Sequence, residues 1–408
     1  MVNLNIELAK KAIKHAQKGE FYKKRFAGIN AGDIKSKEDF EKLPFTDKED
    51  LREAYPLGLA AVDEEKIVRI HSSSGTTGTP VIIPYTQKDV NDWAIMFKRC
   101  YETAGITKSD RIHITPGYGL WTAGIGFQLG AELLGAMAVP LGPGFTDRQI
   151  KMMIDLKSTV LCATSSYALL LAEEIEKRGV KDKIHLKRGV IGSERWGEKM
   201  RNRIANELGV SLFDIYGLTE IYGPGIGINC EHQSAMHMWD DYFYYEIIDP
   251  KTGKLVPEGE VGELVITTYC KEGAPLIRYR THDLTRAIKG TCPCGSKYPR
   301  IDAIIGRSDD MVKVRGAIIY PSRVDELLAK IDGVSSEYQI MLDHLNGKDI
   351  LTLFFETALD GEARKNLEKT VEAEFKREIG MKPVPKAVAI GELARSEKKT
   401  QRVFDNRY

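Results

Sequence analysis

The sequence predicts an α/β protein with a large domain over residues 1–309 and a small α+β domain over residues 310–408. Three observations lead to this prediction. The chain has 408 residues, which exceeds one ordinary domain of about 100–200 residues. Strand-like and helix-like segments alternate from about residue 110 to 216, which indicates parallel strands joined by helical crossovers. Near residue 309 the pattern changes to a unit of about 100 residues, long enough to bury its own core.

The N-terminal part is expected to hold short, lysine-rich helices over residues 1–60, interrupted at Pro44 and Pro56. A β-branched segment, 66–71, then leads through the polar turn 72–80 into a second apolar segment. This order predicts strand, loop and strand.

The nearly uncharged segment 120–142 is long enough to span a membrane. It contains Gln128, Glu132 and several glycines, which let a helix pack closely against its neighbours. We therefore expect a buried helix in a soluble protein.

The remaining elements follow from periodicity. The alternating region predicts strands at 111–115, 159–163, 185–192 and 211–216, with helices at 167–177 and near 196–208. The β-rich part of the large domain predicts strands at 242–248, 262–268 and 286–289. The small domain predicts a hairpin at 311–319, helices at 321–331 and near 363–375, and strands near 337–342 and 349–356.

Composition excludes several classes of function. Lys and Arg number 59 against 58 Asp and Glu, a net charge of +1, so nothing attracts the whole chain to nucleic acid or an anionic membrane. Six cysteines are too few for a disulfide scaffold, and the N-terminus lacks the apolar core of a secretion signal. We expect a cytoplasmic protein with no nucleic-acid or membrane partner. The sequence is compatible with a homodimer and does not decide the oligomeric state.

The polar turn is the sharpest local signal. Its hydroxyls and backbone N–H groups could bind phosphate oxygens, although the Gly-x4-Gly-Lys-Ser/Thr pattern of nucleotide-binding P-loops is absent. By itself, such a loop is more often a surface connection. The candidate phosphate-binding residues are Ser72, Ser73, Ser74, Gly75, Thr76, Thr77 and Gly78.

Other clusters reduce that ambiguity. They are Tyr216–Glu220 at a strand end, Arg278–Asp283, Gly306–Asp310 and Ser396–Arg402. In this order the clusters resemble the acyl-adenylate-forming superfamily. The segments Leu43–Leu51, Pro116–Trp121 and Ile318–Ser322 are similar to those of the phenylacetate–coenzyme A ligase family. The resemblance runs from about residue 40 to the C-terminus.

The resemblance implies a two-step reaction. A carboxylic acid attacks the α-phosphate of ATP and releases pyrophosphate, and the thiol of coenzyme A then displaces AMP. It implies an adenylate-forming large domain and a small mobile domain that swings between the steps. Small-molecule acid, ATP and coenzyme A are the implied partners.

The resemblance also assigns roles to residues. Tyr216 would stack on adenine beside Gly217, and Thr219 would bond a phosphate oxygen. Glu220 would bind Mg2+, which prefers carboxylate and phosphate oxygens. Asp283 would accept hydrogen bonds from the ribose hydroxyls, and Arg307 would donate hydrogen bonds to ribose or phosphate. The segment beside adenine would be Ser193, Glu194 and Arg195.

Two departures from the family pattern matter. Many superfamily members carry a lysine in or just after the phosphate loop, but positions 79–83 here read Thr-Pro-Val-Ile-Ile. Near the C-terminus, Lys398 replaces the glycine that usually precedes the catalytic lysine. Alignment therefore selects Lys399 as the catalytic residue, and Lys398 remains an alternative. Asp309 matches the hinge position, and Lys399 would neutralise charge during adenylation and then swing away.

The acid is expected to be aromatic and similar to phenylacetate. Tyr118 and Trp121 lie beside Gly119, which leaves room for a flat ring, although both could equally be core aromatics. Pro116 stands where relatives often carry an aromatic residue, and Trp121 where they often carry Phe, so the pocket is reshaped.

Two other functions compete. The first is an adenylyltransferase on the same scaffold, acting on a deazaflavin-type coenzyme without forming a thioester. The second is an inert binding protein, with Cys292–Gly295 as part of a metal knuckle; balanced charge and an intact set of Glu220, Asp283 and Arg307 argue against it.

A structural zinc site is predicted from two pairs at i, i+2 spacing, Cys230 with His232 and Cys292 with Cys294. In extended chain each pair points to one side, and together they supply three sulfurs and one imidazole, as tetrahedral zinc prefers. His237 is an alternative ligand. The unpaired cysteines read as small apolar residues: Cys100, Cys162 and Cys270.

Overall fold

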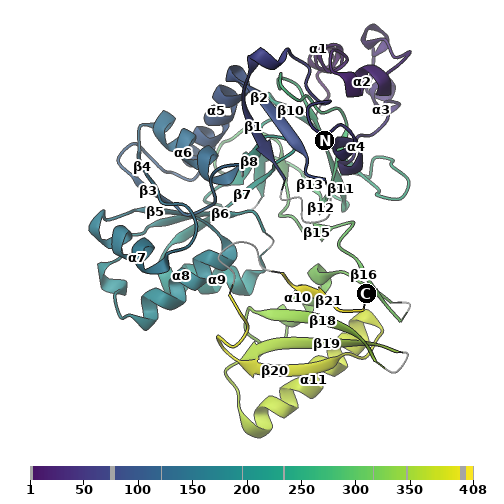
Figure 1. The fold of residues 1–408 in the computed structure, drawn as a ribbon. Helices are drawn as coiled ribbons and strands as arrows, with labels where there is room; N and C mark the ends of the chain where they lie inside the picture. Colours follow the sequence, from purple (N-terminus) through teal and green to yellow (C-terminus); the bar gives the residue numbers. More distant parts are fainter. Residues whose placement is uncertain are drawn as a thin grey trace.

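The computed structural model describes residues 3–73, 79–120, 122–194, 196–232, 235–315, 317–345, 348–395 and 401–407. Figure 1 shows a large N-terminal part with a smaller C-terminal part below it. This arrangement agrees with the α/β fold class expected from the sequence, and the domain boundary at 309 stays a prediction.

The N-terminal segment is helical, as predicted. It consists of α1 (Ile6–Ala16), α2 (Glu20–Arg25), η1 (Ala31–Asp33), α3 (Lys37–Glu41), α4 (Lys48–Glu53) and η2 (Glu64–Lys66). Ser36 and Asp47 begin α3 and α4 with capping boxes. The buried side chains of α1, α2, η1 and α3 share a core with Tyr244 and Ile277 of the β-rich part. The N-terminal segment is therefore held against the strands that carry the candidate site.

The largest sheet has nine strands in the order β13-β14-β9-β8-β7-β6-β5-β3-β4. Its parallel half is β3 (Arg111–Ile114), β4 (Met137–Pro140), β5 (Val160–Thr164), β6 (Arg188–Gly192) and β7 (Ser211–Leu218). Its antiparallel half is β8 (Gly223–Asn229), β9 (Met236–Met238), β13 (Ala287–Ile288) and β14 (Arg300–Ile301).

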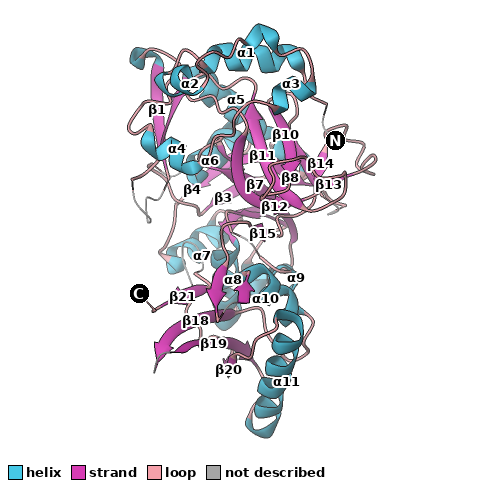
Figure 2. Cartoon of the chain, turned by 90° about the vertical axis from the view of Figure 1, so that its right-hand side faces the viewer, coloured by secondary structure: helices cyan, strands magenta, loops and turns pink. Residues whose placement is uncertain are grey.

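Helices cover both faces of this sheet (Figures 1 and 2). On one face, α5 (Gln87–Thr103) and α6 (Ala123–Leu134) share a core with β8. On the other, α7 (Thr146–Asp155), α8 (Ser165–Lys177) and α9 (Glu198–Leu208) form a second core. The short η3 (Lys181–Lys183) follows α8.

The expectation of one buried helix over 120–142 was wrong in extent. The helix α6 ends at Leu134, because Gly135 adopts the left-handed conformation (φ 82°) that terminates helices. The chain then turns into β4, an edge strand that the sequence analysis missed. In the part of the chain that the structure describes, we find no helix with the length and apolar character that crossing a bilayer requires.

Two further sheets complete the large part. A hairpin of β1 (Ile67–Ser72) and β2 (Ile82–Thr86) flanks the predicted phosphate loop. A four-stranded antiparallel sheet contains β10 (Phe243–Ile248), β11 (Gly262–Thr268), β12 (Tyr279–Thr285) and β15 (Gly306–Arg307).

A bulge interrupts β12. Glu263 pairs with Leu284 and Val265 with Arg280, so residues 281–283 of β12 lie opposite Leu264 alone. His282 at the centre of this bulge has a φ of 64°. Such bulges re-aim side chains and recur beside active sites.

The C-terminal part has its own core. It begins with a hairpin of β16 (Val312–Val314) and β17 (Ala317–Ile319), followed by α10 (Pro321–Ala329). The sheet β20-β19-β18-β21, covered by α11 (Gly361–Ile379), completes it. Its strands are β18 (Tyr338–Leu345), β19 (Lys348–Thr357), β20 (Val384–Ala389) and β21 (Val403–Asp405).

Polar contacts join the two parts. The Nζ of Lys199, on α9, donates to the carbonyls of Leu328, Ile331 and Val334 at 3.0, 2.9 and 2.9 Å. Arg395 bridges Glu173 on α8 and Glu356 on β19, each at 2.8–2.9 Å at the closest approach.

Candidate functional site

The predicted phosphate loop begins and ends at a pair of hydrogen bonds. Ser72 is the last residue of β1 and is buried. The backbone N–H of Ser73 donates to the carbonyl of Val81 (3.1 Å), and the Val81 N–H donates to Ser73 Oγ (3.0 Å). Ser74–Gly78 lie outside the described residues. The hairpin therefore fixes both ends of the predicted loop.

The end of β7 carries the next candidates. Gly217 is required there, because a Cβ atom would lie 1.9 Å from the carbonyl oxygen of Gly223. Thr219 and Glu220 occupy the turn from β7 to β8. The buried Tyr216 donates its hydroxyl to Asp283 Oδ2 at 2.6 Å, a contact the sequence did not predict. This hydrogen bond joins the nine-stranded sheet to the four-stranded one.

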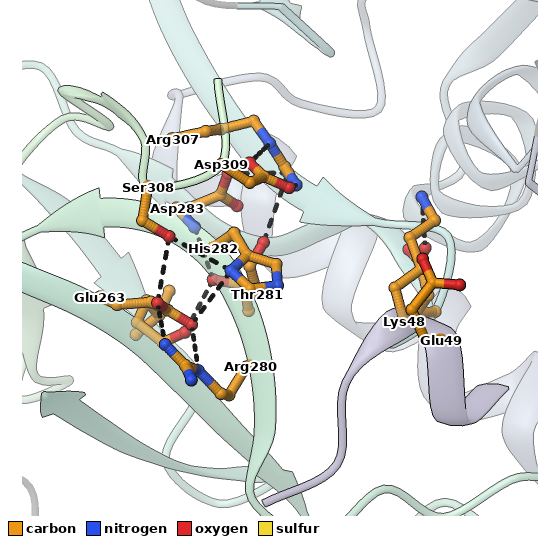
Figure 3. A network of polar contacts seen from close by, with 12 residues as sticks. Lys48, Glu49, Glu263, Arg280, Thr281, His282, Asp283, Arg307, Ser308 and Asp309 are labelled. Atoms are coloured by element: carbon orange, nitrogen blue, oxygen red, sulfur yellow. Dashed lines mark hydrogen bonds and ion pairs between the residues drawn. The ribbon is translucent and has the colours of Figure 1, made fainter. Parts of the chain in front are cut away.

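Asp283 and Arg307 are paired residues of β12 and β15. The guanidinium of Arg307 lies 3.4 Å from Asp283 Oδ1 and also reaches the carbonyl of Thr281 at 3.3 Å (Figure 3). Burial raises the pKa of Asp283, and Arg307 and the Tyr216 hydroxyl oppose that rise. The register thus brings together Asp283, which the resemblance assigned to the ribose, and Arg307, which it assigned to ribose or phosphate.

The predicted hinge residue is also in contact with Arg307. Asp309 accepts from Arg307 Nε at 2.8 Å and from a terminal nitrogen at 2.7 Å. It lies in the connection between β15 and β16. Its role as a hinge stays a prediction.

Glu220 is paired with a residue that the sequence analysis did not select. The Nζ of Lys48 lies 3.1 Å from Glu220 Oε1, whose side chain is only 7% exposed. Thr46 positions this lysine, because its backbone joins the edge of β12: Thr46 N–H donates to the carbonyl of Arg278, and Arg280 N–H donates to that of Thr46. The sequence analysis used the Leu43–Leu51 segment only as a mark of the family. The segment contains Lys48, so this lysine could have been named as a candidate.

The buried Tyr279 lies within the electrostatic influence of several of these charged residues. Burial is the main cause of the raised pKa of this tyrosine, and Glu220, Asp283 and Arg307 all act on it electrostatically. Glu220 also acts on Asp283. The turn after β7 and the strands β12 and β15 therefore form one electrostatic unit. Glu220 offers the carboxylate chemistry that suits Mg2+ there.

A second lysine missed by the sequence analysis lies beneath this unit. Lys271 is buried, with its Nζ 4.2 and 4.3 Å from the ring centres of Tyr85 and Tyr222. It donates to the carbonyl of Ile221, next to Glu220. Burial lowers the pKa of Lys271 to about 7, although Asp89 and Glu220 favour its charge. No sequence pattern distinguishes it from a surface lysine.

The predicted acid pocket is described in part. Gly119 has a φ of 84°, and the ring of Tyr118 lies 2.7 Å from the place of a Cβ on Gly124. The hydroxyl of Tyr118 is buried and has no hydrogen-bond partner within the described ranges. Trp121 lies outside those ranges. Tyr118 is therefore packed against Gly124 with a polar atom still to be satisfied, and its contact with the acid stays a prediction.

The segment predicted beside adenine follows β6. Ser193 has a φ of 73°, and Glu194 Oε1 accepts from the N–H of Ser166 at 2.8 Å and from its hydroxyl. Glu194 thus lies at the N-terminus of α8, where a carboxylate is favourable. Arg195 and the C-terminal candidates Lys398 and Lys399 lie outside the described residues.

The predicted zinc ligands form a cluster, with one correction. Cys230, His237, Cys292 and Cys294 have ligand atoms within 4.8 Å of one another. His232 was the wrong first choice: its side chain is 39% exposed and lies 3.7 Å from Glu231. The turn after β8 carries His232 away, whereas pairing of β9 with β8 and β14 brings His237 into the cluster.

Comparison with known families gives two matches. The AMP-binding enzyme family matches residues 8–270, and the AMP-binding enzyme C-terminal domain matches residues 316–407.

Individual relatives are also similar over most of the chain. The phenylacetate–coenzyme A ligase of Pseudomonas putida is 40% identical over 98% of this chain and 93% of that enzyme. The Escherichia coli (strain K12) phenylacetate–coenzyme A ligase is 39% identical over 99% of this chain and 94% of its own length.

Among solved structures, a 2-hydroxyisobutyryl-CoA ligase is similar in two states. In its postadenylation state with 2-HIB-AMP, the TM-score is 0.89 at 28% identity, covering 98% of this chain and 89% of that one. In its thioesterification state, with 2-HIB-AMP and CoA, the TM-score is 0.71 at 29% identity with the same coverage. The arrangement of the two parts here is therefore closer to that of the postadenylation structure.

Proposed function

The chain belongs to the phenylacetate–coenzyme A ligase family of AMP-binding enzymes, and from this premise we propose that it activates an aromatic acid similar to phenylacetate. As a member, it is an acid–thiol ligase that activates a carboxylic acid through an adenylate and transfers the acyl group to coenzyme A. The observation that carries the assignment to residues is that Asp283 lies between the Tyr216 hydroxyl, at 2.6 Å, and the Arg307 guanidinium, at 3.4 Å.

The nucleotide would bind to this unit. Asp283 would accept hydrogen bonds from the ribose hydroxyls through Oδ1. Its Oδ2 already accepts from Tyr216 at 2.6 Å, whereas Oδ1 has only a long contact, 3.4 Å, with Arg307. Arg307 would donate to ribose or phosphate. Tyr216 and Gly217 at the end of β7 would flank adenine, together with Ser193 and Glu194. Thr219 would hydrogen-bond a phosphate oxygen.

Positive charge at the phosphates would come from several sources. Glu220 would hold Mg2+, which neutralises phosphate charge when bound. Residues 79–83 contain no lysine, and Lys48 at 3.1 Å from Glu220 supplies a cation from a different segment. Lys399 would act near the reacting carboxylate and α-phosphate, as its place in the C-terminal motif implies, and Asp309 would serve as the hinge.

The acid would lie beside Tyr118 and Gly119, with Trp121 nearby. Two facts favour an aromatic acid. The relatives from Pseudomonas putida and Escherichia coli are phenylacetate–coenzyme A ligases, and apart from its chain neighbours no described atom lies within 4 Å of the position that a Cβ of Gly119 would take, beside the aromatic Tyr118. Adenylylation of a deazaflavin-type coenzyme finds no support among the relatives described above.

ATP–pyrophosphate exchange with a panel of acids tests this proposal. Phenylacetate and benzoate derivatives should support exchange, and coenzyme A should then release AMP with formation of a thioester. Exchange with medium-chain aliphatic acids or 2-hydroxyisobutyrate alone would contradict the aromatic assignment. Exchange without any coenzyme A-dependent release of AMP would contradict the second step.

A further inference from the structure

One edge of the nine-stranded sheet carries a compact group of sulfur and nitrogen atoms, the Cys/His cluster of Cys230, His237, Cys292 and Cys294. The Sγ atoms of Cys230 and Cys292 are 3.5 Å apart, and Cys294 Sγ lies 3.4 Å from His237 Nε2. Cys230, His237 and Cys292 are buried, and Cys294 is half-buried.

Three separate segments build the Cys/His cluster. Cys230 directly follows β8, and His237 is the central residue of β9. Both cysteines of the third segment lie in the connection from β13 to β14, where the N–H of Gly295 donates to the carbonyl of Cys292 at 3.0 Å. The pairing of His237 with Ile228 on one side and with Arg300 on the other brings the three segments together.

The separations exclude a disulfide and fit a metal. A disulfide requires sulfurs about 2.05 Å apart, and every cysteine in the cluster is a free thiol. Tetrahedral zinc, with Zn–S about 2.3 Å and Zn–N about 2.0 Å, holds two sulfurs about 3.8 Å apart and sulfur and nitrogen about 3.5 Å apart. The observed 3.5 and 3.4 Å are close to those values.

We propose that Cys230, His237, Cys292 and Cys294 bind one Zn2+ ion as a structural site. Three thiolates and one imidazole complete a tetrahedral shell of soft and borderline ligands, which favours zinc over the oxygen-seeking Mg2+. With four protein ligands, no coordination position stays open for substrate or water. The ion would therefore stabilise the fold and take no part in acid activation.

The short strands at this edge of the sheet are the feature that a zinc ion would stabilise. β13 and β14 have two residues each and β9 has three, too few for strands that must hold a sheet edge by backbone pairing alone. A zinc ion would fasten the β13–β14 connection to the end of β8. Because the ligands are distant in sequence, binding would also favour the folded chain over the unfolded one.

Two histidines provide a matched test. Tag-free protein purified without chelator should contain about one zinc ion per chain by elemental analysis. His237→Asn should lose that zinc, whereas His232→Asn should keep it, because the His232 side chain is 39% exposed and lies beside Glu231, outside the Cys/His cluster. Cys294→Ser should lose the zinc, and Cys270→Ser, a cysteine outside the cluster, should keep it.

A measurement on the unmodified chain keeps the test independent of whether a variant folds. Titration with a mercurial reagent should release the zinc as three of the six thiols react, and a chelator should lower the thermal midpoint. A wild-type chain with no zinc, in either the purified or the zinc-supplemented and dialysed form, would overturn the proposal. Equal zinc content in the His237→Asn and His232→Asn variants would overturn it as well.

Discussion

Two carboxylates on neighbouring strands of one sheet have opposite environments. Glu263, on β11, is fully buried and is bound by Arg280 at 2.8 and 2.7 Å and by the Ser308 hydroxyl at 3.1 Å. Burial alone would raise its pKa, but hydrogen bonds from His282 and Arg280 lower the pKa of Glu263 to about 2. Asp283, on β12, has a raised pKa, chiefly because of burial. Figure 3 shows both groups.

The difference separates a structural acid from one that can accept a ligand. Both oxygens of Glu263 are occupied by protein donors, so it fixes β11 to β12. Asp283 has one short hydrogen bond, from Tyr216, and one long contact with Arg307. The bulge at residues 281–283 turns Asp283 toward Tyr216 while His282 reaches Glu263. The bulge in β12 thus directs His282 to the structural acid Glu263 and leaves Asp283 able to accept a ligand.

The largest effect should come from removing the structural acid. Glu263→Gln leaves the Arg280 charge without its carboxylate, so we expect a loss of about 3–5 kcal/mol in the free energy of unfolding. Urea unfolding measures it, and Glu260→Gln is the control, because Glu260 is an exposed glutamate in the connection that leads into β11. A change no larger than that of the control would contradict the structural role.

The same acid should control stability at low pH. Because the pKa of Glu263 is lower in the folded chain than the ordinary 4.5, its contribution is present above about pH 4.5 and is lost as the pH falls toward 2. Glu263→Gln should remove that part of the pH dependence of unfolding.

The ligand-accepting acid should behave in the opposite way. Asp283→Ala should reduce ATP–pyrophosphate exchange by about 10²–10³-fold. It should lower the free energy of unfolding by only about 1–3 kcal/mol, less than Glu263→Gln, because the buried Tyr216 hydroxyl loses its acceptor while Arg307 keeps its contacts with Asp309. Asp302→Ala, which removes a surface partner of Arg286, is the control. Loss of stability in place of activity would show that Asp283 resembles Glu263.

These two acids also show how far the sequence could lead. Resemblance to the family selected Asp283, but its neighbours Arg278, Arg280 and His282 read only as basic residues nearby. Their partners, Glu246 and Glu263, lie on other strands, and the bulge depends on the register with β11. Neither these ion-pair partners nor the bulge can be predicted from the sequence of one segment alone.

The same limit explains the other differences. Periodicity predicted the alternating strands and helices because each signal is local. The end of α6 at Gly135 was also a local signal, but it lay inside an apolar run that hid β4. Lys48 reaches Glu220 because Thr46 joins β12, and His237 joins the Cys/His cluster because β9 pairs with two strands. Such contacts between distant segments need the fold.

A smaller effect is expected from Lys48. Lys48→Met keeps much of the side-chain volume and removes the cation beside Glu220, so pyrophosphate exchange should fall by about tenfold, or about 1.4 kcal/mol. Lys42→Met, a highly exposed lysine in the same segment, should have no effect. If Lys48 merely neutralises Glu220, activity should be unchanged while stability falls, and the assignment to phosphate chemistry would be wrong.

The smallest effect should arise where the two parts of the molecule meet. Lys199 contacts three carbonyls at the C-terminal end of α10 and just beyond it. The arrangement of the two parts is closer to a postadenylation structure than to a thioesterification structure. Lys199→Ala should weaken this arrangement by roughly 0.5–1 kcal/mol and change populations by about two- to fivefold. Pyrophosphate exchange should fall by that factor, whereas thioester formation from supplied acyl-adenylate should be unchanged or faster, because that step needs the small part to leave this position. Lys181→Ala, which removes a surface contact within the large part, should alter neither step. An equal decrease in both half-reactions would show that Lys199 supports the fold of α9 and has no influence on which arrangement the enzyme adopts.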